Sequence, residues 1–279
     1  MTMHTSIRRL LVLAMAIVLG ACATSGGPRG ATAQRLYVID CGHGRAADVS
    51  RWTPGIDVGQ PRDFVGTCYL IRHRDGWLLW DTGITDAVAA MADGLPPADR
   101  GGIHWFRHTT LTASLRQIGI APSDIRYVAI SHSHPDHIGN LALFPQAQLL
   151  VQRAEYDWPT PQGTPRFPAR PEVIRIEGDH DVFGDGSVRL IATPGHTPGH
   201  QSLLVRLKGT GAVLLTGDAA HFRENWEARR VPAINFDKAA SVVSMDKLAA
   251  LAAAEKAQVW INHDAAQRAT LKLAPAWYD

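Results

Sequence analysis

The sequence has little net charge, few cysteines and no long hydrophobic stretch. Lys and Arg number 28 against 26 Asp and Glu, which gives a net charge of +2, and no long basic run occurs. Nucleic-acid binding relies on clustered positive charge, so the composition argues against nucleic acid as the main partner. The three cysteines lack the spacing of metal ligands, and no short internal repeat is visible.

The longest apolar run, at residues 10–19, follows Arg8 and Arg9. It is too short to span a bilayer as a helix but suits the core of a signal peptide. The run leads into Gly20-Ala21-Cys22, which resembles the lipobox of bacterial lipoproteins. We predict a signal peptide of the lipoprotein type at residues 1–21 and a flexible tether at residues 22–34.

A lipid anchor on Cys22 would then be the only membrane attachment. The next residue is Ala23, and no aspartate follows that would favour the inner membrane. We therefore expect an exported protein that faces the periplasm from the outer membrane. An ordinary signal peptide cut nearby is the alternative.

Residues 35–279 suffice for one two-sheet domain, and 46% of the whole chain is apolar. A helix is predicted at 111–118, which Gly119 ends, and one helix or two joined helices at 238–254. The stretches 46–64, 95–110 and 158–171 have neither pattern and are interpreted as walls of a pocket. Strands are predicted at 35–40, 67–72, 77–81, 125–131, 148–152, 173–177, 188–193, 202–207, 212–217 and 257–261.

The densest group of potential metal ligands is Ser131-His132-Ser133-His134-Pro135-Asp136-His137. It follows a strand-like segment, so it should lie on a loop at a strand end, where a rigid sheet can aim several side chains at one point. Three imidazoles and a carboxylate packed this closely suit zinc and similar divalent ions. The pattern therefore predicts a metal site.

Three further potential ligands each follow a predicted strand: His196, Asp218 and His263. Gly195 and Gly217 allow the backbone to turn tightly beside two of them. With the first loop they supply five His and two Asp, which is enough for two metal ions. Asp218 is the expected bridge between the ions.

The pattern His132-x-His134-x-Asp136-His137, followed by His196, Asp218 and His263, resembles the metallo-β-lactamase superfamily. The intervals between these residues are most similar to those of the N-acyl-homoserine lactone lactonases. Residues 36–42, 78–83, 182–186 and 193–200 are similar to that branch too. The likeness covers about residues 35–279.

The resemblance implies an α/β fold, an αβ/βα four-layer sandwich of two mixed sheets with outer helices. It implies two divalent metal ions, with zinc favoured, although cobalt, manganese or iron would also fit. The first ion would be bound by His132, His134 and His196, and the second by Asp136, His137 and His263. Asp218 would bind both.

The implied activity is quorum quenching, in which the lactone ring of N-acyl-homoserine lactones is opened. In that reaction two metal ions would lower the pKa of a bridging water, and the resulting hydroxide would attack the lactone carbonyl. Asp136 or Asp218 would then move a proton to the leaving group. No side-chain nucleophile is needed.

One position departs from the lactonase pattern. The family usually has a Tyr three residues after the bridging Asp, where it donates a hydrogen bond to the substrate carbonyl, and here that residue is His221. Imidazole can donate the same bond from a shorter arm. His221 is therefore a candidate catalytic residue, with a spectator role as the alternative.

Other residues have two interpretations. Asp81 either orients a ligand histidine or forms the turn before Thr82, and His200 is expected to be structural rather than a ligand. Cys41 and Cys68 are expected to be buried thiols, with a disulfide as the alternative. Packed or solvent-facing roles are expected for His43, His73, His104, His108 and His180.

Alternative functions remain open at this stage. The same fold could hydrolyse other lactones, esters, thioesters or organophosphates, or the chain could be a non-catalytic metal-binding lipoprotein. A β-lactamase is disfavoured, because the familiar branches lack a bridging Asp at the position of Asp218. Family members often form homodimers, but no segment of this sequence identifies an interface.

Overall fold

The computed structural model of the chain describes residue 1 and residues 31–99, 102–170 and 172–279. Apart from Met1, the predicted signal peptide lies outside the described residues, as do Cys22 and most of the predicted tether. Ala33 is buried, and its N–H donates to the carbonyl of Arg206 at 2.8 Å. Among the described residues, contacts with the domain therefore extend to Ala33, two residues before the predicted start at residue 35. Within the described ranges no helix has the length and apolar content needed to cross a membrane.

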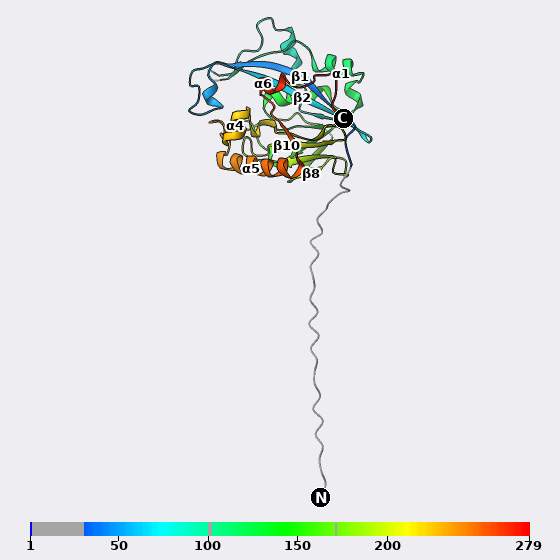
Figure 1. The fold of residues 1–279 in the computed structure, drawn as a ribbon. Coiled ribbons are helices and arrows are strands. Elements are labelled where there is room, and N and C mark those ends of the chain that lie inside the picture. Colours follow the sequence, from blue (N-terminus) through cyan, green and yellow to red (C-terminus); the bar gives the residue numbers. More distant parts are fainter. Residues whose placement is uncertain (2–30, 100–101, 171) are drawn as a thin grey trace.

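Two β-sheets lie face to face in the described part of the chain (Figure 1). The larger sheet has the strand order β4 (Ile103–Phe106), β1 (Arg35–Ala46), β2 (Arg62–His73), β3 (Gly76–Trp80), β5 (Ile125–Ala129), β6 (Gln148–Gln152), β7 (Val173–Ile176). The smaller sheet has the order β12 (Gln258–Trp260), β11 (Gly211–Leu215), β10 (Gln201–Leu207), β9 (Val188–Ala192), β8 (His180–Asp181).

Both sheets are mixed, as predicted. In the larger sheet β4, β1, β2 and β3 pair antiparallel, whereas β3, β5, β6 and β7 run parallel. In the smaller sheet only the pair β11–β12 is parallel among the described strands. The helices are α1 (Leu111–Ile118), α2 (Pro135–Ile138), α3 (Arg153–Tyr156), α4 (Arg223–Ala228), α5 (Lys238–Glu255) and α6 (Ala265–Arg268).

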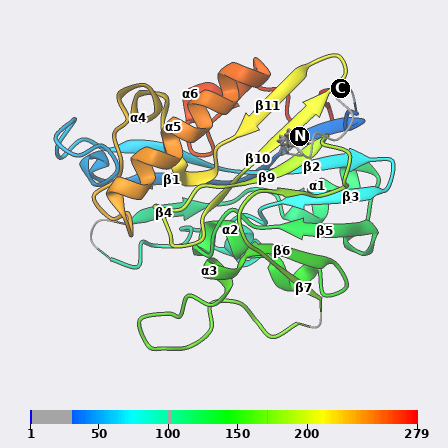
Figure 2. The same cartoon turned by 90° about the horizontal axis from the view of Figure 1, so that it is seen from below.

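The alternation of side chains along the strands produces the layers. In β2, Tyr69 and Ile71 face the core between the sheets, whereas Leu70 faces the outer core that contains Leu115 of α1. In β11, Leu214 faces the opposite outer core beneath α5. Figures 1 and 2 show α5 covering the outer side of the smaller sheet. The fold is therefore the four-layer sandwich that the family resemblance implies.

Local capping explains why the two long predicted helices form where expected. The Thr110 hydroxyl accepts from the N–H of Ala113, and Gly119 ends α1 with φ 87°. The Asp237 carboxylate accepts from the N–H of Ala240 at the start of α5. Residues 238–255 form a single helix, which settles the choice between one helix and two.

Two of the predicted irregular stretches contain strand structure, so that part of the prediction was wrong. β1 continues to Ala46 and β2 begins at Arg62, where the two residues pair, and β4 forms within the stretch 95–110. Trp105 of β4 packs with Phe64 in a small buried cluster beside β1. Long-range pairing and burial of these aromatics override the glycines that make the local sequence look irregular.

The expectation of two free thiols was also wrong. Cys41 and Cys68 form a disulfide, with their Cα atoms 5.8 Å apart. Antiparallel pairing of β1 with β2, with a bulge between Asp40 and Gly42, puts the two cysteines side by side. The sequence shows neither the register nor the bulge.

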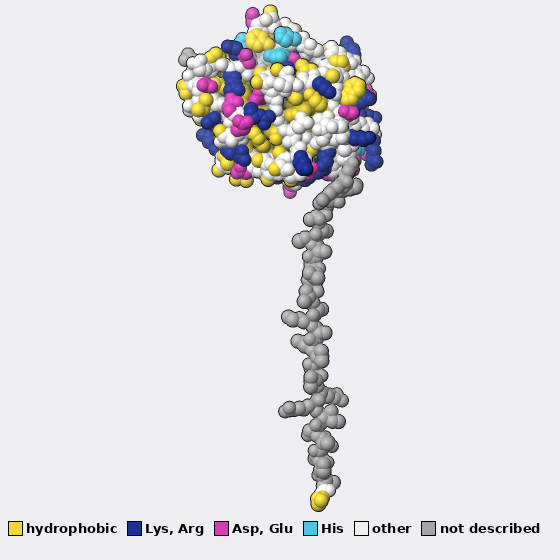
Figure 3. All heavy atoms as spheres, in the orientation of Figure 1, with side chains coloured by type: hydrophobic (Ala, Val, Ile, Leu, Met, Phe, Trp, Pro, Cys, Tyr) yellow, Lys and Arg dark blue, Asp and Glu magenta, His cyan; other side chains and the backbone are white. Residues whose placement is uncertain are grey.

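Charge is mixed over the visible surface. On the face seen in Figure 3, Lys and Arg side chains are interspersed with Asp and Glu. This distribution agrees with the small net charge of +2.

Candidate metal centre

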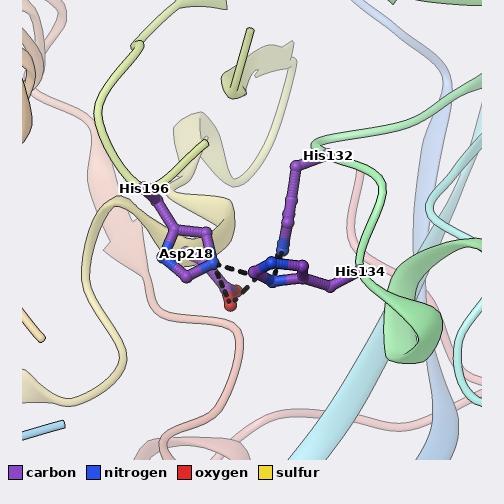
Figure 4. Close-up of side chains that lie close together, drawn as sticks. All are labelled: His132, His134, His196 and Asp218. Carbon is purple, nitrogen blue, oxygen red and sulfur yellow. Dashed lines mark hydrogen bonds and ion pairs between the residues drawn. The ribbon is translucent and has the colours of Figure 1, made fainter. Parts of the chain in front are cut away.

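The predicted ligands converge because their strands end at one edge of the sandwich. His132 and His134 follow β5, Asp136 and His137 lie in the short α2, and the other three follow β9, β11 and β12. The N–H of Gln201 donates to the carbonyl of Ser131 at 2.9 Å, which joins the two sheets at this edge. Figure 4 shows three of the histidines pointing toward the carboxylate of Asp218.

The first group contains His132, His134, His196 and Asp218. Their potential ligand atoms all lie within 4.8 Å of one another. Nδ1 of His134 is 2.9 Å from Nε2 of His132 and 3.1 Å from Nε2 of His196. Oδ2 of Asp218 is 3.4 Å from Nε2 of His196.

The second group contains Asp136, His137 and His263, again within 4.8 Å of one another. Oδ2 of Asp136 is 3.6 Å from Nε2 of each histidine. Oδ1 of Asp218 is 3.4 Å from Nε2 of His137 and 3.1 Å from Nε2 of His263. The carboxylate of Asp218 therefore lies between the two groups, with one oxygen near each.

The donor set fits divalent metal ions. Nε2 of His137 and Oδ1 of Asp218 are buried and have no hydrogen-bond partner within the described part of the chain. Buried polar atoms without partners are costly, and a cation between them would remove that cost. A set of imidazole nitrogens and carboxylate oxygens suits zinc.

Asp81 both forms a turn and orients a ligand, so the two interpretations of this residue are compatible. Its φ is 57°, and its side chain is buried. Oδ2 of Asp81 lies 2.8 Å from Nδ1 of His137, and the carboxylate also accepts from the N–H and hydroxyl of Ser131. This bond leaves Nε2 of His137 facing the metal site.

Two other ligand histidines are oriented by groups that the sequence analysis missed. Nδ1 of His196 donates to Oδ1 of Asn235 at 3.0 Å, and Nδ1 of His263 donates to the carbonyl of Val65 at 2.8 Å. Asn235 lies in an irregular loop, and Val65 contributes only its backbone. No sequence signal marks either group, because the contacts depend on how distant segments pack.

His200 is structural, as expected. Its Nδ1 donates to the carbonyl of Thr193 at 3.1 Å, and its Nε2 accepts from the N–H of Asp218 at 2.9 Å. A Cβ at Gly217 would lie 2.8 Å from this Nε2, so a glycine is needed there. His200 therefore fixes the loop that carries Asp218.

His221 lies beside Asp218 in the centre, which is the position that a catalytic role requires. Its side chain is buried, and its Nε2 is 3.2 Å from Oδ2 of Asp218. The ring stacks on that of His263 with centroids 5.4 Å apart. Asp218, His221 and His263 form a third set of side chains with ligand atoms within 4.8 Å.

Burial and neighbouring charge set the protonation of these groups. Burial lowers the pKa of His134 and that of His196 to about 3. Burial also acts on His137, but the carboxylates of Asp218, Asp136 and Asp81 outweigh it and raise its pKa well above the usual value. The histidines around Asp218 outweigh its burial and hold its pKa well below the usual value.

Five histidines for which packed or solvent-facing roles are predicted lie apart from the ligand groups, as expected. His43 is hydrogen-bonded to Asp40, and His73 is buried against Asp185. Within the described ranges, the groups of side chains able to bind a metal ion include none of His43, His73, His104, His108 and His180.

Comparisons with known proteins define the class. The model of the metallo-beta-lactamase superfamily matches residues 61–255. The chain therefore belongs to the metallo-beta-lactamase superfamily, and within it to the branch that contains N-acyl homoserine lactonases.

One relative is the N-acyl homoserine lactonase AttM of Azorhizobium caulinodans, 35% identical over 76% of this chain and 86% of the relative. Another is an N-acyl homoserine lactonase of a Bacillus species, 32% identical over 88% of this chain and 99% of the relative. A solved structure of an N-acyl homoserine lactone hydrolase, with N-hexanoyl-L-homoserine at its catalytic metal center, is 29% identical. It superposes with a TM-score of 0.77 over 89% of this chain and 100% of that chain.

Proposed function

We propose that the protein is a dinuclear metal-dependent hydrolase that opens the lactone ring of N-acyl-homoserine lactones. The observation that carries this proposal is the carboxylate of Asp218 between two groups of ligand side chains. The relatives named N-acyl homoserine lactonase support the choice of substrate. Mixed charge on the visible surface supports a small molecule rather than nucleic acid as the partner.

One ion would be bound by His132, His134 and His196. The other ion would be bound by Asp136, His137 and His263. Asp218 would bind both ions. The nitrogen-rich donor set favours zinc. When bound, two such ions supply a water that ionises near neutral pH and a Lewis acid for the lactone carbonyl.

The side chains also suit the proton transfer that ring opening requires. Hydrolysis adds one water across the C–O bond, so the leaving ring oxygen must gain a proton. The side chain of Asp136 is 16% exposed, whereas that of Asp218 is only 4% exposed and contacts several histidines. Asp136 is therefore the better placed of the two to deliver the proton to a substrate entering from solvent.

Apolar side chains beside the centre support an acyl substrate. Phe236 is 62% exposed, contacts Trp158, and follows Asn235; its N–H donates to the carbonyl of His196. Exposed aromatics next to a reactive centre can hold an acyl chain. Phe222 and Trp226, in contrast, are buried and pack into cores rather than facing a pocket.

The test combines metal analysis with turnover. The purified chain is loaded with zinc, its metal content is measured, and acid release from N-acyl-homoserine lactones of several chain lengths is followed with a pH indicator. Two metal ions per chain with lactone turnover are the expected result. Two ions without lactone turnover, but with cleavage of other esters, thioesters or phosphotriesters, would assign the alternative substrates. Protein that binds no metal would overturn the proposal.

We further propose that the protein is exported and attached to the outer membrane through Cys22. The Cys41–Cys68 disulfide supports an oxidising compartment. The wild-type protein should incorporate a labelled fatty acid and fractionate with the outer membrane, and replacement of Cys22 by Ser should abolish this incorporation. A homodimer, which the family resemblance suggests, can be tested on the same material by light scattering after size-exclusion chromatography.

A further inference from the structure

Glu155 is a fully buried carboxylate beside the metal centre that belongs to neither ligand group. It lies in the short helix α3. Its Oε1 accepts from the N–H of Ser133 at 2.8 Å and from the hydroxyl of Ser133 at 2.6 Å. Its Oε2 accepts from the hydroxyl of Thr197 at 2.6 Å and from the N–H of Gly199 at 3.0 Å.

These four bonds join the two loops that supply the histidines of the first group. Ser133 stands between His132 and His134, and Thr197 directly follows His196. Figure 4 shows these histidines approaching Asp218 from separate loops. A single carboxylate therefore sets the distance between the loops on which the three imidazoles depend.

The contact is specific and tightly packed. A buried carboxylate is costly unless hydrogen-bonded, and four donors on its two oxygens suit a group that acts only as an acceptor. A Cβ at Gly199 would lie 2.2 Å from the backbone nitrogen of Glu155, so only glycine allows this approach. The contact of Glu155 with this loop therefore depends on the absence of a side chain at Gly199.

We propose that Glu155 is a positioning residue for one metal ion, the ion bound by His132, His134 and His196. This inference rests on the proposed metal-dependent function. The second group is held by other means, because His137 is oriented by Asp81 and His263 by the carbonyl of Val65. Glu155 therefore controls the affinity of one site and leaves the other site unchanged.

The test is Glu155→Gln in the full chain, with the two zinc dissociation constants measured by competition with a chromophoric chelator. Glutamine keeps one acceptor oxygen but places an NH₂ against donors, and the backbone N–H groups cannot turn away. Loss of such an orienting partner typically weakens metal binding about 10–100-fold. We expect one constant to rise by that factor and the other to stay within about twofold.

Three readouts separate positioning from a general loss of structure. Excess zinc should restore kcat of Glu155→Gln with KM unchanged, because the reloaded site is intact. Asp81→Asn should weaken the opposite site more than the first, because Asp81 contacts His137 directly and reaches His132 only through Ser131. The melting temperature of chelator-treated protein reports any general damage.

Glu177→Gln is the matched control. Glu177 pairs with Arg153, which lies in α3 like Glu155, but the side chain of Glu177 is 72% exposed. This variant should change neither constant. If Glu155→Gln fails to fold, Thr197→Val removes one of the four donors and should weaken the same site by a smaller factor.

The outcomes separate the two proposals. Wild-type protein that binds no zinc overturns the proposed function itself. Wild-type protein that binds two ions, while folded Glu155→Gln binds both as tightly or loses both equally, overturns the positioning role alone. If Thr197→Val must serve instead, unchanged or equally weakened constants have the same meaning.

Discussion

At the scale of single residues, the surroundings rather than the residue type decide what a side chain does. His134 and His137 are three residues apart, yet burial lowers the pKa of the first and nearby carboxylates raise that of the second. A metal ligand needs a neutral imidazole with a lone pair directed at the ion. The bonds at the far nitrogens of His137, His196 and His263 provide that direction.

Asp136→Asn tests the proton transfer. The amide can still offer an oxygen to a metal ion but cannot deliver a proton, so kcat for lactones should fall roughly 100-fold. Turnover is measured after zinc loading, with metal content determined on the same sample. Full metal content with unchanged kcat would remove Asp136 from the proton-transfer step.

His221→Phe tests the residue that departs from the lactonase pattern. Phenylalanine keeps a ring against His263 but loses the bond between Nε2 and Asp218. We expect kcat to fall roughly 100-fold, as for loss of one hydrogen-bond donor at a reacting centre. Zinc affinity, measured in parallel, should fall less. Wild-type turnover in the variant would make His221 a spectator.

At the scale of elements, the site depends on where strands stop and on what ties their ends together. β5, β9, β11 and β12 each end directly before a ligand-bearing loop. Rigid strands deliver the ligands to one edge, while side chains such as Glu155 connect loops that no strand pairing joins. β1 is likewise connected to α6 by the contact of Asp40 with Arg268.

Asp40→Asn gives a pH-dependent test of the link between β1 and α6. Burial raises the pKa of Asp40, but the bond from His43 and the charge of Arg268 outweigh it and lower the pKa to about 2. A lowered folded-state pKa stabilises the fold above pH 3.8, and this contribution disappears as the pH falls toward 2. The group is partly exposed, so the loss at pH 7 should be about 1 kcal/mol.

Urea unfolding of both proteins at several pH values measures this effect. The stability difference between wild type and Asp40→Asn should be largest near neutral pH and should vanish near pH 2. A difference that is constant with pH would show that the loss comes from packing rather than from the charge.

At the scale of the whole molecule, the two sheets and the proposed metal ions would stabilise one another. The core between the sheets contains residues from both, such as Trp80 and Val213, and the ligand loops close one edge of this core. A bound ion would therefore link the two halves of the sandwich, because His132 follows a strand of one sheet and His196 a strand of the other.

Metal removal should lower the thermal stability of the whole domain. A ligand present at a thousand times its dissociation constant stabilises the folded state by about 4 kcal/mol, which corresponds to about 10 °C for a domain of this size. Calorimetry of chelator-treated protein, before and after addition of zinc, measures the change. Magnesium, which prefers oxygen ligands, should not restore the melting temperature. An identical melting temperature with and without chelator would contradict a metal-linked fold.

The resemblance to the metallo-β-lactamase superfamily implied the two-sheet fold, whereas the residue patterns predicted α1, α5 and the seven side chains that meet at the centre. Those residue patterns are local: apolar residues recur with the period of a helix or a strand, and the ligands directly follow strands. The expectation that Asp218 is the shared carboxylate came from the count of ligands and from the family resemblance, and the structure places its oxygens near both groups.

Only the tertiary structure decided the contacts that depend on register and loop packing. Four such features join segments that carry no matching local signal. They are the pairing of Cys41 with Cys68, the strand β4, the bond of Asn235 to His196, and the contact of Glu155 with two ligand loops. Such contacts are fixed when the whole chain packs, because burial and hydrogen-bond satisfaction choose partners that the local sequence leaves open.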